Sequence, residues 1–139
     1  MIVRSFLFNE YPYSVDRCKK EEIEEGYILE EPEMLVRRVD DEFFYITRIG
    51  EETVSKIGED AYSFFMNNAV FTTYKTRYIV PLYDETVCNL DYYHGSNLRV
   101  ASVEFDNEED SEAFYPPVWF GEEVKGFKGL IKTREIWYN

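Results

Sequence analysis

Hydrophobic and polar residues alternate along much of the chain, and a spacing of two predicts β-strands, whose successive side chains point to opposite faces. Eight segments show this alternation or an apolar run bounded by turn residues. They are residues 2–8, 27–29, 34–39, 43–49, 69–73, 75–80, 86–92 and 98–105. The region 119–137 is predicted to add a last strand or a short helix.

Three other segments carry helical signals. Ser14 is suited to cap a helix over residues 14–25. Apolar residues at helical spacing predict a second helix over residues 53–68. Asn107 is suited to cap a third helix over residues 108–114, which two prolines follow closely.

These elements predict an α+β fold in one domain over residues 1–139, with a mostly antiparallel sheet of about eight strands and a few peripheral helices. An antiparallel sheet of that size often closes on itself, because closure removes exposed strand edges. An eight-stranded barrel has an interior wide enough only for side chains or one small ligand. The sequence therefore predicts a closed, tunnel-like β-barrel.

Two basic residues fall on one face of a predicted strand. Lys75 and Arg77 are two residues apart among apolar neighbours, so both are expected to project to the inside of the sheet. A buried charge is costly unless an opposite charge faces it. The predicted partner is either a small anionic ligand or an internal carboxylate, Asp91 or Glu104, and the residues alone leave both open.

The charge balance excludes some classes of partner. The net charge is −13, from 28 acidic and 15 basic residues, and such a surface repels nucleic acid and anionic membranes at long range. The stretch 104–112 holds six acidic residues and no basic one, which is typical of a solvated helix face or of a surface that docks on a basic partner.

Cys18 and Cys88 form no metal or disulfide motif. No apolar run is long enough to cross a bilayer and no secretory signal is recognised, so a cytoplasmic location is predicted.

The ordered string of segments resembles the CYTH domain, the family of triphosphate tunnel enzymes. The matching segments run in family order over residues 2–8, 23–28, 36–39, 45–49, 75–78, 89–91, 98–105 and 119–124. Residues 23–28 are similar to I-x-Q-G-Y-L, 36–39 to V-R-x-R and 75–78 to K-x-R-Y. The resemblance implies a barrel in which carboxylates hold one or two divalent metals while Lys and Arg clamp a triphosphate. Members include class IV adenylyl cyclases, thiamine triphosphatases and inorganic triphosphatases.

The chain departs from this pattern at several positions. Where the first strand of the family carries Glu, Glu and Lys, this sequence has Met1, Val3 and Ser5. Other charged positions of the pattern are occupied by Val39, Ile49, Val54 and Ser102. The four apolar replacements (Val3, Val39, Ile49 and Val54) are predicted to fill part of the tunnel.

The resemblance implies a reduced set of site residues. The phosphate-binding candidates are Arg37, Lys75 and Arg77, with Arg48 or Lys125 as further cations, and the weaker metal-ligand candidates are Glu52, Asp91, Glu104 and Glu123. A single carboxylate with water holds Mg²⁺ or Mn²⁺ weakly. No cofactor is therefore assigned, although Mg²⁺ or Mn²⁺ belongs to the catalytic alternative.

Three functions follow from these residues. The first is a degenerate member of the family, a binding or regulatory module with a partial phosphate or nucleotide site and little or no catalysis. The second is a metal-dependent triphosphatase or nucleotidyl cyclase. The third is an acidic protein-interaction module or inhibitor. The substituted carboxylates favour the first, so the enzyme assignment leans to no.

Overall fold

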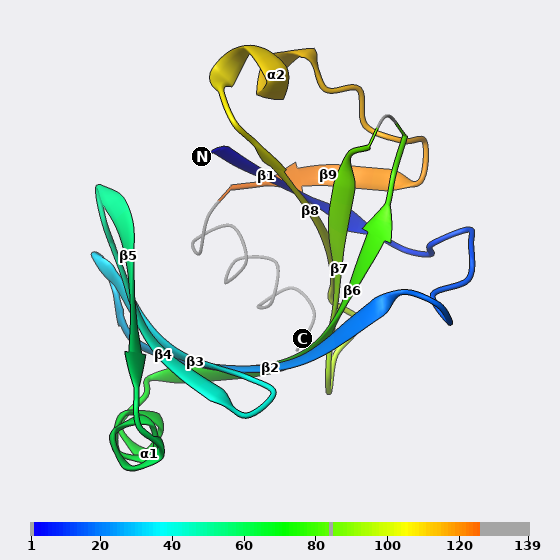
Figure 1. Cartoon of the computed structure of the whole chain (residues 1–139). Coiled ribbons are helices and arrows are strands. Elements are labelled where there is room, and N and C mark those ends of the chain that lie inside the picture. The colour runs from blue at the N-terminus through cyan, green and yellow to red at the C-terminus, as the bar shows by residue number, and fades with distance from the viewer. Residues whose placement is uncertain (1, 84, 126–139) are drawn as a thin grey trace. The chain divides into compact units, whose positions relative to one another are not determined.

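The computed structural model describes residues 2–83 and 85–125 (Figure 1). Most of these residues lie in strands, as the alternating pattern predicts. The elements in chain order are β1 (Ile2–Phe8), β2 (Lys19–Glu30), β3 (Glu33–Val39), β4 (Glu42–Ile49), β5 (Glu51–Ile57), α1 (Glu59–Asn67), β6 (Phe71–Pro81), β7 (Val87–Tyr93), β8 (Arg99–Phe105), α2 (Glu108–Ala113) and β9 (Phe120–Val124).

The chain divides into two compact units. Residues 21–76 form one, here the central unit, and residues 2–20 with 77–125 form the other, the terminal unit. Hydrogen-bonded neighbours run β5-β4-β3-β2-β6 in the central unit and β6-β7-β8-β1-β9 in the terminal unit. The described registers are antiparallel. Across the described residues this order has two ends, β5 and β9, so closure into a barrel is not confirmed, and the single domain over 1–139 stays a prediction.

The core of the terminal unit lies on one face of β8. Ala101, Val103 and Phe105 are buried there, in a cluster that also includes Phe8 and Leu90. The intervening residues of β8 face the other way, so Ser102 and Glu104 are left for a polar face. Aromatic rings from the segment after α2 complete the core, as Trp119 packs edge-on against Phe8.

The core of the central unit is built by β2, β3 and β4 with α1 packed against β3 and β4. Ile23, Leu35 and Ile46 are fully buried. Tyr62 of α1 is also buried, and its ring lies 4.9 Å from that of Phe43 on β4. Burial raises the pKa of Tyr62, whose hydroxyl also donates a hydrogen bond to the carboxylate of Glu24 at 2.8 Å.

Several predicted helices and strands are confirmed, and three secondary-structure predictions are wrong. The strands at 2–8, 34–39 and 43–49 form, as does the helix that Asn107 caps by accepting a hydrogen bond from the Asp110 backbone N–H. The helix predicted over 14–25 is instead strand β2, because Ile23, Glu25 and Tyr27 are all buried at a spacing of two. The polar Glu25 hides this alternation in the sequence.

The other two errors concern boundaries. The helix predicted over 53–68 is a strand followed by a helix, since β5 pairs with β4 and Gly58 starts α1. The two strands predicted at 69–73 and 75–80 are the single strand β6. Of the predicted element at 119–137, β9 is present, and residues 126–137 lie outside the described residues.

The apolar replacements do not form a buried filling. Val3, Ile49 and Val54 are each more than half exposed, and Val39 is half-buried. The prediction that these residues fill a tunnel is therefore wrong for Val3, Ile49 and Val54, because their side chains reach solvent.

Arg4 connects β1, β9 and α2 in the terminal unit. Its Nε and Nη2 donate to the Glu123 carboxylate at 3.0 and 2.9 Å, and its Nη1 donates to the Ser111 carbonyl at 2.7 Å. These hydrogen bonds hold the pKa of Glu123 below its ordinary value. A bidentate pair of this kind is stronger than a typical surface ion pair.

Replacement of Glu123 by Gln tests this connection. We expect E123Q to lower the free energy of unfolding by about 1 kcal/mol at pH 7. Because the folded-state pKa lies below the unfolded-state value of about 4.3, the contribution is complete above the unfolded-state pKa and is lost as pH falls through the folded-state pKa. Urea unfolding from pH 7 to pH 3 measures it. E122Q, at the exposed neighbouring position, is the control; equal losses in both variants would contradict the assignment.

Candidate functional site

A buried carboxylate joins two of the phosphate-binding candidates in the central unit. Glu25 of β2 lies directly opposite Arg37 of β3 in the strand register. Its Oε2 accepts from Arg37 Nε at 2.9 Å and lies 2.8 Å from Arg37 Nη2, and its Oε1 lies 3.2 Å from Lys75 Nζ of β6. We call Glu25, Lys75 and Arg37 the charge cluster.

Burial makes this cluster unusual. Glu25 and Lys75 are 2% and 5% exposed, while the Arg37 side chain keeps 21% of its surface. Glu25 faces two cations in a dry setting, where a charge without a partner is costly. Among the residues that the structure describes, Nη1 of Arg37 makes no hydrogen bond. The cluster therefore presents one partly exposed cation for a further anion.

The third phosphate-binding candidate is paired in the terminal unit. Arg77 of β6 donates from Nε and Nη2 to the two carboxylate oxygens of Asp91 on β7, at 2.7 and 3.0 Å. Asp91 is 2% exposed. The predicted internal partner Asp91 is thus confirmed for Arg77, whereas the cluster partner of Lys75 is Glu25, which the sequence analysis did not name. Glu25 was missed because its segment was taken for a helix.

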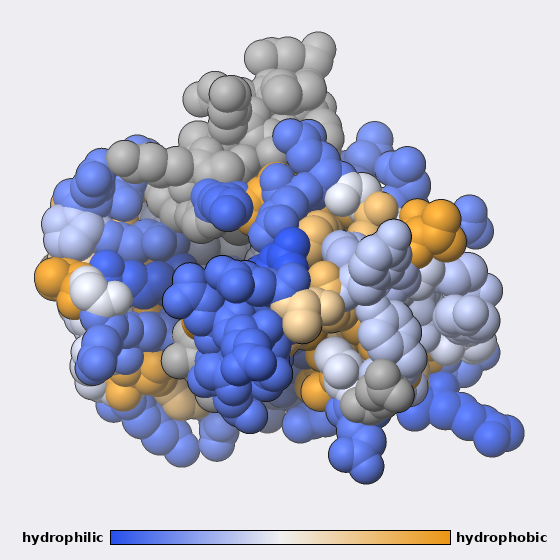
Figure 2. Space-filling view, turned by 90° about the horizontal axis from the view of Figure 1, so that it is seen from above, coloured by the Kyte–Doolittle hydropathy of each residue, from blue (hydrophilic) through white to orange (hydrophobic). Residues whose placement is uncertain are grey.

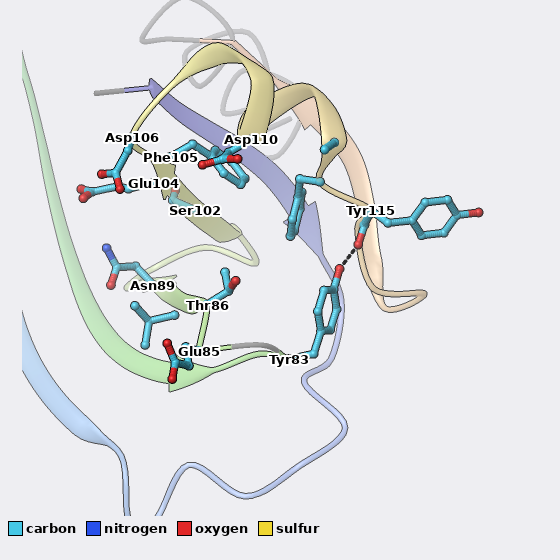
Figure 3. A pocket seen from close by; sticks show the side chains of 13 residues that line it. Tyr83, Glu85, Thr86, Asn89, Ser102, Glu104, Phe105, Asp106, Asp110 and Tyr115 are labelled. Atoms are coloured by element: carbon cyan, nitrogen blue, oxygen red, sulfur yellow. Dashed lines mark hydrogen bonds between the residues drawn. The ribbon is translucent and has the colours of Figure 1, made fainter.

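A pocket of about 540 Å³ lies in the terminal unit, between α2 and the strands β7 and β8 (Figure 3). Its acidic lining residues are Glu85, Glu104, Asp106 and Asp110. Figure 3 shows Glu104 and Asp106 side by side at one end, with Tyr83 at the other. The Tyr83 hydroxyl donates to the Tyr115 carbonyl. Among the residues that the structure describes, this lining has no basic residue, and its carboxylates disfavour anions.

The metal-ligand candidates do not assemble into one site. Glu52 is exposed on β5 and accepts a hydrogen bond from Arg48 at 3.1 Å. Asp91 is held by Arg77, Glu123 is held by Arg4, and Glu104 lines the pocket opposite Val3 of β1. Within residues 2–83 and 85–125, no group of three or more His, Cys, Asp or Glu residues is arranged to hold a metal ion.

The Cys88 thiol is a poor nucleophile. Burial raises the pKa of the Cys88 thiol to about 12, so it is protonated at neutral pH. Cys18 is half-buried and both thiols are free.

The surface is largely polar. Most described residues on the face drawn in Figure 2 are hydrophilic, with smaller hydrophobic patches between them. The described helices α1 and α2 are both too short to cross a membrane. The exposed acids at the start of α2 match a solvated helix face, and an acidic docking surface and a cytoplasmic location both stay predictions.

Comparison with known proteins identifies the fold. No protein-family model matches the chain. The crystal structure of the inorganic triphosphatase NE1496 aligns with 92% of this chain and 91% of its own, at 29% identity and a TM-score of 0.69. An inorganic triphosphatase of Nitrosomonas europaea is 48% identical over 52 residues, which are 36% of this chain and about a third (34%) of that protein.

The chain resembles the CYTH, or triphosphate tunnel, family in fold and in part of its sequence. This confirms the family resemblance drawn from the eight ordered segments. The PH1819 protein from Pyrococcus horikoshii OT3 aligns with 98% of both chains at a TM-score of 0.69, but at 15% identity it shares the fold alone.

The charge cluster makes a prediction about stability. We expect K75M to lower the free energy of unfolding by about 2–3 kcal/mol, because a buried carboxylate loses one of its two cations. K56M is the matched control, since Lys56 forms an exposed pair with Glu42 at 3.4 Å, and it should change stability by less than about 0.5 kcal/mol. Urea unfolding at neutral pH compares them. Similar small losses in both variants would show that the buried cluster contributes no more to stability than an exposed ion pair does.

Proposed function

We propose that this chain binds a linear triphosphate or a triphosphate-containing small molecule through Arg37 and Lys75 of the central unit. The observation that carries the proposal is the charge cluster, in which Lys75 and the partly exposed Arg37 guanidinium share the carboxylate of Glu25. Arginine forms short, paired hydrogen bonds with phosphate oxygens, and a buried setting strengthens them. Similarity to inorganic triphosphatases supports a triphosphate as the ligand.

We further infer that the chain works as a binding or regulatory module with little catalysis. Transfer of a phosphoryl group requires stabilisation of the charge on the transferred group. Strands β1 and β8 carry fewer charges than the family pattern: Val3 faces Glu104 in their register, and Ser5 is hydrogen-bonded to Ser102 at 3.0 Å. Binding needs the cations alone, so it survives these substitutions. Closure of the strands into a tunnel around the ligand is part of this proposal.

Binding is tested by isothermal titration calorimetry with tripolyphosphate. We expect the wild-type chain to bind without added metal, and R37Q to weaken the affinity at least about tenfold, because charge-assisted hydrogen bonds to phosphate are lost. R38Q is the matched control, since Arg38 is the next residue of β3 and points to its opposite face. Equal losses in R37Q and R38Q would point to a general charge effect and contradict the site.

Hydrolysis of the triphosphate is the second candidate, and the similarity to the inorganic triphosphatase of Nitrosomonas europaea favours it. Mg²⁺ or Mn²⁺ would then supply charge stabilisation at the transferred phosphoryl group. The acidic residue retained for such a role is Glu104, at the pocket.

Phosphate release separates the two candidates. For the binding module we expect no release above the protein-free rate from tripolyphosphate or ATP, with Mg²⁺ or Mn²⁺ present. Release that E104Q and R37Q each abolish, while E122Q retains it, would instead establish the hydrolase. E122Q removes an exposed carboxylate and so controls for net charge.

A further inference from the structure

The carboxylate of Glu25 lies between two basic side chains. Its two carboxylate oxygens are divided between the cations, Oε1 toward Lys75 and Oε2 toward Arg37. A phosphate group presents oxygens to basic side chains in the same way, because both groups accept charge-assisted hydrogen bonds. The carboxylate therefore occupies the place where the two cations converge.

We propose that Glu25 is an internal counter-ion that competes with the anionic ligand for Lys75 and Arg37, and that it sets the affinity of the site. The inference rests on the proposed triphosphate binding and adds a residue that limits it. In the free protein Glu25 stabilises two cations that would otherwise lie close together with little solvent around Lys75. When a polyanion arrives, the same charge opposes it.

The strand geometry keeps Glu25 in this role. Glu25 and Arg37 are cross-strand partners, so the backbone of β2 and β3 holds the carboxylate beside the guanidinium whether or not a ligand is bound. Gln at this position would remove one negative charge from beside the two cations. Because Gln has nearly the same shape, the substitution changes the charge more than the packing.

If Glu25 positions Arg37 instead of competing with the ligand, its neutralisation has the opposite effect on affinity. If Glu25 served mainly to orient the Arg37 side chain toward the ligand, its neutralisation would loosen Arg37 and weaken binding. If it competes, neutralisation strengthens binding. The sign of the change in affinity therefore decides between the two roles, and a merely structural role would change stability with no gain in affinity.

The test is tripolyphosphate titration of the intact chain by calorimetry, with wild type, E25Q, E33Q and R37Q at the same salt concentration. We expect E25Q to bind about tenfold tighter than wild type, as expected for loss of one like charge within a few ångströms of the ligand. E33Q is the matched control: Glu33 pairs with Arg48 at 2.7 Å in the central unit, so it makes the same charge change outside the cluster. Its affinity should stay within about twofold of wild type.

The outcomes separate the inference from the proposed function. Wild-type binding that R37Q removes, with unchanged or weaker binding in E25Q, overturns the competition and leaves the triphosphate site standing. Equal gains in E25Q and E33Q also overturn it. Binding by E25Q with none detectable in wild type supports it, and no binding by either overturns both.

A second variant tests the proposal if E25Q does not fold. If thermal unfolding shows that E25Q is not folded, E25D retains the charge but shortens the side chain by one methylene, which lengthens its contacts with both cations. We then expect E25D to bind tripolyphosphate at least about twofold tighter than wild type, since a more distant charge competes less. Affinity equal to or below wild type overturns the proposal.

Discussion

The charge cluster of Glu25, Lys75 and Arg37 joins three strands of the central unit, β2, β3 and β6. A lysine 5% exposed inside a sheet is costly unless a carboxylate faces it, and Glu25 meets that requirement for two cations at once. The strand register places these residues together, since β2 pairs with β3 and neighbours β6. The same ionic contacts that stabilise the fold thus keep two basic groups in place for an anion.

A second ion pair follows the same principle in the terminal unit. Arg77 is held by the buried Asp91, so this third phosphate-binding candidate also has an internal carboxylate. A site built in this way stays folded without ligand, at the cost of a lower affinity for anions. The acidic pocket beside α2 has the opposite character, because its lining carries carboxylates and no basic residue.

The sequence predicted the parts of the fold that depend on local signals. The alternation in 2–8 and 98–105 and the Asn107 cap each reflect one strand or one helix end, and all three form. It failed where the deciding interaction is non-local. Glu25 looks like a solvent residue in a polar helix, and only its pairing with Lys75 and Arg37, 50 and 12 residues away along the chain, shows that it is buried in a strand. A period of two through Ile23, Glu25 and Tyr27 was the available signal.

The central claim is that a triphosphate binds at Arg37 and Lys75, and a crystal structure of the chain with tripolyphosphate tests it most directly. We expect phosphate oxygens within about 3 Å of the Arg37 guanidinium and of the Lys75 ammonium. Tripolyphosphate bound elsewhere, with the Glu25 contacts to both cations unchanged and no phosphate beside Arg37, would contradict it.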